Sequence, residues 1–221
     1  FMFGDREAGL IYGTYGSLVY AMPVLGGLIA DRYLGYRKAV MFGAVLLVCG
    51  HFGMAFEGPP AVVTEHGVVR DGFYAQTFYL SLAFIIVGVG FLKANISTIV
   101  GQLYGENDPR RDGGFTIFYM GINIGSLIPP LFIGSVVKKW GWHWGFLLAA
   151  IGMIISFFTF LTGRKVLGNA GAVPKHSILF QQKWKRWFFH FLLFIGIVIS
   201  LFVFYTILQY PIVSNAVLVC L

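Results

Sequence analysis

The sequence predicts an all-α fold, a bundle of helices that cross a membrane several times. Hydrophobic residues make up 57% of the 221 positions and charged residues only 11%, less than half of the ~25% typical of soluble domains. The apolar residues also gather in runs about as long as the ~17–25 residues with which a helix crosses a bilayer. A soluble globule could not cover its surface with so few charges, and a disordered, collagenous or disulfide-stapled chain is excluded as well.

Charged positions divide the chain into six apolar segments. Continuous runs of this length favour helices over the strands of a membrane barrel, whose residues alternate over about ten positions. The predicted spans are residues 8–30, 39–56, 73–100, 115–137, 144–162 and 187–208.

The basic residues between these spans orient them, because Lys and Arg accumulate in cytoplasmic loops. One set of loops holds eleven of them: Arg32, Arg37, Lys38, Arg110, Arg111, Arg164, Lys165, Lys175, Lys183, Lys185 and Arg186. The other set holds only Arg6, Arg70, Lys138 and Lys139. We therefore predict that the first set is cytoplasmic and that both ends of the sequence and the loop at 57–72 are external. The net charge of +7 then has a topological explanation and does not indicate nucleic-acid binding.

Three parts follow from this division. Residues 1–162 form an N-terminal transmembrane bundle, 163–186 a basic cytoplasmic linker, and 187–221 a further transmembrane helix with the start of the next segment. The linker could bind the anionic inner leaflet, although control of topology is the simpler interpretation. Because the sequence stops within an apolar run, we expect a piece of a longer protein.

Cysteine and histidine residues give no sign of a metal site or of any cofactor. Cys49 and Cys220 stand alone in apolar runs and are predicted to be buried small hydrophobes. His51 and His190 have no neighbour at the spacing of metal ligands. We predict that both are packed, hydrogen-bonded histidines.

Lys93 is the sixteenth basic residue and lies within the third span, about eight residues or ~12 Å from its inner end. It either snorkels, pairs with a carboxylate elsewhere in a longer protein, or faces a water-filled cavity that receives a substrate anion. We favour a functional role because a charge inside a membrane is costly. All nine carboxylates fall in loops or at helix ends: Asp5, Glu7, Asp31, Glu57, Glu65, Asp71, Glu106, Asp108 and Asp112.

Polar side chains also occur in the fourth span. Tyr119 and Asn123 are four residues apart and so share one face of the helix. Asn123 could serve a cavity or bond a neighbouring helix, and the two interpretations have equal weight. Gly121 and Gly125 have the spacing of a close helix–helix contact.

The first span carries a stripe of Tyr12, Gly16 and Tyr20, each four residues apart. Tyr12 could belong to an interfacial aromatic belt. Tyr20 lies deeper, where its hydroxyl needs a partner in a cavity or on a neighbouring helix.

The end of the first span reads Gly26-Gly-Leu-Ile-Ala-Asp-Arg-Tyr-Leu-Gly-Tyr-Arg-Lys38. This stretch resembles the motif of the major facilitator superfamily between its second and third helices, a cytoplasmic gate motif. The positions that carry it are Gly27, Asp31, Arg32, Gly35 and Arg37.

Two further stretches are more specific. Residues 91–100 read Phe-Leu-Lys-Ala-Asn-Ile-Ser-Thr-Ile-Val, and residues 108–127 contain Phe-Tyr-Met-Gly-Ile-Asn-Ile-Gly-Ser-Leu. Together they resemble the signature of the proton-dependent oligopeptide transporter family, in particular its bacterial members. The match runs from about residue 13 to residue 163.

This resemblance implies a multi-pass protein of the cell inner membrane that couples proton flow to uptake of di- and tripeptides by alternating access. The family fold has two six-helix bundles, so the sequence would be its N-terminal half, from helix two to helix six, plus one helix between the bundles. The first helix and the second bundle would be absent, and this piece alone is not expected to transport.

The resemblance also implies site residues. The cavity Tyr of the family matches Tyr20, its Lys matches Lys93 and its Asn matches Asn123, while Tyr119 lies on the Asn123 face. Lys93 is expected to attract the peptide carboxylate and to take part in proton coupling, and the other three to hydrogen-bond the peptide.

Other functions fit less well. A transporter of nitrate or a small organic anion would also use Lys93. An intramembrane enzyme is disfavoured because no span has an Asp pair, a metal-spaced His cluster or a Ser with a His base. A channel subunit does not need Lys93 or the loop motif, and nothing in the sequence predicts an oligomeric state.

Overall fold

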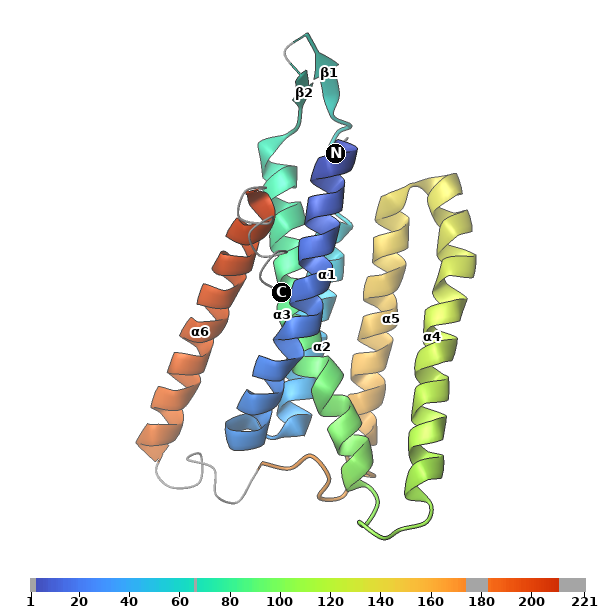
Figure 1. Cartoon of the computed structure of the whole chain (residues 1–221), viewed down its shortest axis with the longest axis vertical. Helices are drawn as coiled ribbons and strands as arrows, with labels where there is room; N and C mark the ends of the chain where they lie inside the picture. Colours follow the sequence, from blue (N-terminus) through green and yellow to red (C-terminus); the bar gives the residue numbers. More distant parts are fainter. Residues whose placement is uncertain (1–2, 66, 174–182, 211–221) are drawn as a thin grey trace.

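The computed structural model describes residues 3–65, 67–173 and 183–210, and within them the predicted membrane bundle is confirmed. Six helices are long and apolar enough to cross a membrane, and Figure 1 shows them running along a common direction. The helices are α1 (Asp5–Ile29), α2 (Tyr36–Met54), α3 (Gly72–Gln102), α4 (Arg111–Trp140), α5 (Trp142–Gly163) and α6 (Lys183–Gln209). Most begin and end within a few residues of the predicted spans, and α6 begins inside the predicted linker.

A small β-hairpin is the one departure from an all-helical chain among the described residues. Strands β1 (Val62–Thr64) and β2 (Gly67–Val69) pair antiparallel between α2 and α3, where β-branched residues favour extended backbone. The hairpin, the start of α1 and the α4–α5 turn lie at one end of the bundle, called the hairpin end (Figure 1). The predicted cytoplasmic loops lie at the opposite end.

Helices α1, α2 and α3 form the centre of the bundle. The side chains of Ile86, Val87 and Phe91 are almost fully buried there. The backbones of α1 and α3 approach so closely that a β-carbon on Gly26 would collide with the carbonyl oxygen of Gly90. Only glycine permits such an approach, and it is how this pair of helices gains its contact area.

Helix α4 lies at the edge of the bundle beside α5 (Figure 1) and has no buried residue. A β-carbon on Gly121 or Gly125 would meet nothing within 4 Å among the described residues. The close packing predicted for these two glycines is therefore not made within this part of the chain. A uniformly apolar helix does not reveal by its sequence which face meets a neighbour.

Cys49 corrects another prediction, because its side chain is exposed on α2 and not buried. The apolar run around it covers all faces of the helix, so hydrophobicity alone could not place it. Cys220, the linker positions 174–182 with Lys175, and the segment 211–221 lie outside the described residues.

Candidate functional site

The structure brings together two of the predicted site residues, Tyr20 on α1 and Lys93 on α3. The ammonium nitrogen of Lys93 lies 4.2 Å from the centre of the Tyr20 ring, within the range of a cation–π interaction. Tyr20 was expected to need a partner for its hydroxyl, but its ring is what makes the contact. The hydroxyl forms no hydrogen bond with the described residues, and the Tyr20 side chain is 75% exposed.

No carboxylate among the described residues lies within ion-pairing distance of Lys93. The ion pairs found there are Arg70–Glu7 and Arg110–Asp108, and His143 contacts Glu57. Lys93 itself is exposed on the bundle. Lys93 is thus an exposed basic residue within a membrane-spanning helix, in contact with an aromatic ring.

Tyr119 and Asn123 lie together on α4, as their spacing predicts. Both line a groove of about 650 Å³ with Phe115, Thr116 and other residues of that helix. The Tyr119 side chain is 56% exposed, and Asn123 is exposed too. Among the described residues no hydrogen bond, ion pair or ring contact joins this pair to Tyr20 or Lys93, and the two pairs line no common pocket.

The predicted gate motif forms a distorted turn where α1 meets α2. A π-helical turn, Ala30–Leu34, contains Asp31 and Arg32, both exposed, and Gly35 follows with a φ of 77°. This left-handed conformation suits glycine. Gly27, the first motif position, faces α3, where its β-carbon position is 4.0 Å from that of Ala94.

Arg37, the last residue of the motif, has a role that the sequence did not reveal. Its Nε donates to the carbonyl of Ala170 and its Nη2 to that of Gly168, both at 2.5 Å. Its backbone N–H donates to the carbonyl of Gly171 at 3.0 Å, and the N–H of Gly171 donates to Oε1 of Gln102 at 2.7 Å. Arg37 therefore fastens the segment 164–173, which follows α5, to the ends of α2 and α3.

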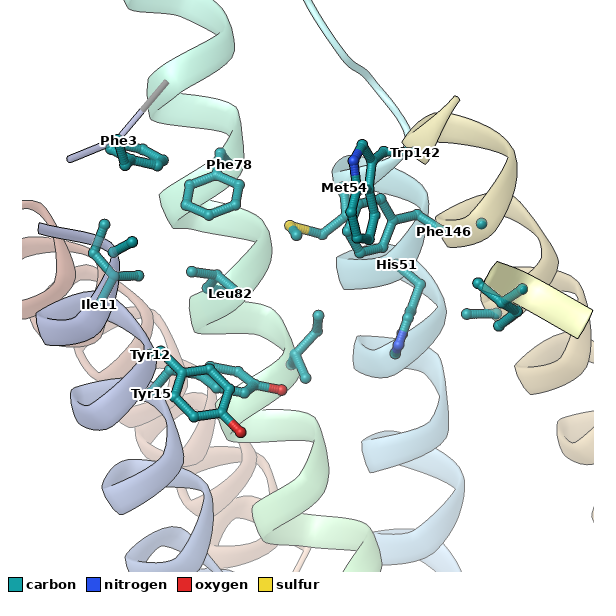
Figure 2. Close-up of a pocket in the computed structure, with 15 residues that line it drawn as sticks. Phe3, Ile11, Tyr12, Tyr15, His51, Met54, Phe78, Leu82, Trp142 and Phe146 are labelled. Atoms are coloured by element: carbon teal, nitrogen blue, oxygen red, sulfur yellow. The ribbon is translucent and has the colours of Figure 1, made fainter. Parts of the chain in front are cut away.

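An apolar cavity of about 570 Å³ opens towards the hairpin end between α1, α2, α3 and α5. In Figure 2, Tyr12 and Tyr15 reach it from α1, His51 from α2, and Trp142 and Phe146 from α5. The Nδ1–H of His51 donates to the carbonyl of Leu47 at 2.8 Å, which confirms the hydrogen-bonded histidine predicted there. None of its described lining residues is Lys, Arg, Asp or Glu, so the cavity offers no partner for a charged solute.

His190 differs from His51. It is exposed on α6, and its ring meets Phe189 edge-to-face with 6.1 Å between centroids. The predicted packing of His190 inside the bundle is therefore wrong within the described chain.

An ion pair and a histidine–carboxylate contact at the hairpin end were also not predicted. Arg70, before α3, pairs with Glu7 of α1 at 2.9 Å and lies 4.5 Å over the Phe3 ring. His143 of α5 lies 3.4 Å from the Glu57 carboxylate after α2. Each pair joins residues far apart in sequence, which no local spacing could reveal.

A family profile described as the POT family matches residues 37–196, or 160 of the 221 positions. This chain belongs to the POT family. The family and the six helices make it a multi-pass protein of the inner membrane, with the N-terminal bundle fold of the major facilitator superfamily.

Among curated POT relatives, the "Di-/tripeptide transporter" of Lactococcus lactis is 42% identical over 158 residues, covering 72% of this chain and 29% of the relative. The "Peptide transporter YePEPT" of Yersinia enterocolitica is 40% identical over 155 residues, covering 70% and 28%. The "Uncharacterized transporter YclF" of Bacillus subtilis is 42% identical over 171 residues, covering 77% and 32%. This POT chain thus spans about a third of the length of these relatives.

Solved POT structures superimpose on most of the chain. A POT peptide transporter in complex with sulfate has a TM-score of 0.72 at 35% identity, covering 94% of this chain and 38% of that one. A POT family transporter in complex with 5-aminolevulinic acid also has a TM-score of 0.72, at 37% identity, covering 96% and 41%. These relatives are transporters, and the fold of this POT chain is theirs.

Proposed function

We propose that this chain is part of a symporter that carries di- and tripeptides into the cell together with protons, by alternating access. The observation that carries the proposal is the unpaired intramembrane cation Lys93, held over the Tyr20 ring. POT relatives named as peptide transporters support the substrate class. In this role the chain is a transporter and not an enzyme, needs no cofactor, and has the peptide, the proton and the lipid bilayer as its partners.

The contact between Lys93 and Tyr20 suits a reversible anion site. A cation–π contact contributes about 0.5–2 kcal/mol, depending on desolvation, while a hydrogen bond to a charged group contributes about 1.5–3 kcal/mol. When no protein carboxylate is paired with Lys93, a peptide carboxylate can therefore draw its ammonium away from the ring. Tyr20 holds the side chain when the site is empty.

Tyr119 and Asn123 supply the neutral part of the proposed site. The Tyr hydroxyl donates and accepts, and the Asn amide offers two donors and one acceptor. These groups match peptide N–H and C=O groups and termini, which all peptides share. Recognition of the backbone in preference to side chains would allow many peptide sequences to be carried.

Proton coupling follows if a carboxylate of the complete protein and the substrate carboxylate compete for Lys93. Protonation of the protein carboxylate releases Lys93 for the substrate, so that substrate binding and proton binding favour each other. The proton gradient could then drive accumulation.

Transport of another small anion is the second candidate, because Lys93 would attract any carboxylate. A related POT structure contains 5-aminolevulinic acid, which has a carboxylate but no peptide bond. Competition of unlabelled 5-aminolevulinic acid and nitrate against labelled dialanine separates the candidates. Dialanine is expected to compete best.

The test is uptake of labelled dialanine by the full-length protein in proteoliposomes, with and without an imposed proton gradient. We expect Lys93→Ala to lower gradient-driven uptake at least about tenfold, because the charge-assisted hydrogen bond to the substrate is lost. Lys139→Ala is the matched control, since Lys139 lies 5.0 Å from the Trp140 ring at the hairpin end. Uptake against a gradient by Lys93→Ala equal to that of the control would contradict the proposal.

A further inference from the structure

A polar cavity of about 500 Å³ lies between α3 and α4 at the predicted cytoplasmic end. Most of its lining residues carry polar side chains, unlike those of the cavity near the hairpin. From α3 come Ser97, Thr98 and Gln102, and from α4 come Arg111 and Tyr119. Of the residues predicted for the substrate site, only Tyr119 lines this cavity.

Arg111 extends its guanidinium from α4 across to α3. A β-carbon on Gly101 would lie 3.7 Å from Nη2 of Arg111 and 3.4 Å from the ring of Phe115. No carboxylate of the described chain pairs with Arg111, since nearby Asp108 is engaged by Arg110 at 2.8 Å. Arg111 therefore offers an unpaired, fork-shaped donor at the wall of a cavity, the geometry that suits a carboxylate.

Glu106 lines the same cavity and, among the described residues, it too has no ion-pair partner. One cation and one anion thus border the cavity without neutralising each other. A zwitterionic solute carries the matching pair, with its carboxylate for Arg111 and its ammonium for Glu106.

The neutral groups of the cavity keep free capacity for hydrogen bonding. The hydroxyls of Ser97 and Thr98 donate to the carbonyl of Ala94, at 2.8 and 3.1 Å, which leaves their oxygen lone pairs to accept. Gln102 accepts from Gly171 through Oε1 at 2.7 Å, which leaves its amide N–H groups to donate. Peptide N–H and C=O groups could be satisfied by both kinds of partner.

A stripe of side chains connects this cavity with the groove at Asn123. Arg111, Phe115, Tyr119 and Asn123 are spaced four residues apart on α4, and Phe115 and Tyr119 line both the cavity and the groove. The stripe spans twelve residues, or about 18 Å along the helix. On α3, Ser97 is one turn from Lys93 and faces the same side.

We propose that this cavity is a second binding station for zwitterionic peptides at the cytoplasmic mouth, with Arg111 holding the carboxylate and Glu106 the ammonium. The inference rests on the proposed function and deepens it. A peptide that leaves Lys93 meets a second cation before it reaches the cytoplasm, so it is released in two steps. The station also binds peptide that enters from the cytoplasmic side.

The experiment measures the KM for labelled dialanine in right-side-out and inside-out membrane vesicles that contain the full-length protein. Uptake into inside-out vesicles probes the cytoplasmic face. We expect Arg111→Gln to raise the KM there about tenfold, because a charge-assisted bidentate bond is lost, and to change the KM in right-side-out vesicles less than about twofold, since Lys93 is intact. Dialaninamide, which lacks the carboxylate, should show no such rise.

Arg110→Gln is the matched control, because Arg110 is the adjacent arginine and does not line the cavity. It should leave the KM of both vesicle types unchanged, and Arg111→Lys should recover part of the loss. If Arg111→Gln matches Arg110→Gln in inside-out vesicles, or if dialaninamide is affected equally, this inference is overturned. If the wild-type protein carries no dialanine in either vesicle type, the proposed function itself fails, and this inference with it.

Discussion

Two asparagines on neighbouring helices differ in burial, Asn95 being buried between helices and Asn123 exposed in a groove. Asn95 of α3 is 1% exposed, and its Nδ2 donates to the carbonyl of Gly26 on α1 at 3.3 Å and to that of Phe91 at 2.7 Å. Asn123 of α4 is exposed and lines a groove. Asn95 therefore stabilises the contact between α1 and α3, while the side chain of Asn123 forms no hydrogen bond with the described residues.

We expect Asn123→Ala to weaken dialanine binding and to leave thermal stability nearly unchanged. Loss of a neutral hydrogen bond costs about 0.5–1.5 kcal/mol, which corresponds to a severalfold rise in Kd. Isothermal titration and thermal denaturation of the full-length protein in detergent would measure both quantities.

Asn95→Ala provides the opposite comparison. It should lower the free energy of unfolding by about 0.5–1.5 kcal/mol for each hydrogen bond lost, because the side chain no longer donates to the carbonyls of Gly26 and Phe91. If Asn123→Ala lowers stability as much as Asn95→Ala and leaves the Kd unchanged, Asn123 is a packing residue.

Sequence reasoning at this scale identified residues but not their partners. Lys93 and Tyr20 were each selected for their depth in a span and by the family motif. Their mutual contact depends on how α1 and α3 cross, and the crossing is fixed by Gly26 and Gly90. No local pattern connects positions 73 residues apart.

At the scale of elements, the contact of Arg37 with the segment 164–173 joins three helices at one end of the bundle. The segment forms turns, and Ala170 packs with Val40 of α2 and Ile99 of α3. Gly171 has a φ of 73°, and a β-carbon there would lie 2.9 Å from Cγ of Arg37. The start of α2 and the end of α3 are thus tied to the chain that leaves α5.

Arg37→Ala should release this segment. We expect faster hydrogen–deuterium exchange in peptides that cover residues 164–173, because three hydrogen bonds to the segment depend on Arg37 and its position. Lys38→Ala is the control, since Lys38 is adjacent and exposed. Arg37→Lys should behave like the alanine variant, because an ammonium cannot reproduce the two directed bonds of a guanidinium. Equal exchange in Arg37→Ala and Lys38→Ala would show that Arg37 does not hold the segment.

The loop between α3 and α4 is held separately and resists acid. The Arg110 guanidinium and backbone N–H bond Asp108 and lower the pKa of its carboxyl from 3.8 to about 2. A lowered pKa means that the contribution of this contact is present above pH 3.8 and is lost only as the pH falls through about 2. This local contact within the α3–α4 loop therefore persists across the physiological range of pH.

Sequence analysis located the helices well but did not reveal how the segment after α5 is held. Charges limit each apolar run, so the ends of α1 to α5 could be predicted within a few residues. The linker was judged by its basic residues, but what fixes its first part is a set of backbone carbonyls. Carbonyls are present at every position and leave no mark on the sequence.

For the whole molecule, the loops separate into two groups at opposite ends of the bundle, as the distribution of basic residues requires. The hairpin and the α4–α5 turn lie at one end, and the π-helical turn, the α3–α4 loop and the segment after α5 lie at the other (Figure 1). The number and alternation of the spans could be predicted because each is a separate apolar run. The position of α4 at the edge could not, because it depends on which helices pack together.

The predicted orientation can be tested with single cysteines in a full-length protein that lacks Cys49 and Cys220. A cysteine replacing Val63, exposed in the hairpin, should react with a membrane-impermeant maleimide on intact cells. A cysteine replacing Asn107, exposed in the α3–α4 loop, should react only after permeabilisation. The reverse pattern would invert the topology, and with it the side to which the second station belongs.

The bonds from Arg37 to backbone carbonyls also bear on how this region can evolve. Because the guanidinium contacts main-chain atoms, the side chain of Asn169 between its two acceptors can change without loss of the contact. Gly171 has no such freedom, since any side chain there would enter the space of Arg37. Among related sequences, many residue types should therefore occur at position 169 and few at positions 37 and 171. Arg37 and Gly171 are 134 residues apart, but loss of either should remove the contact.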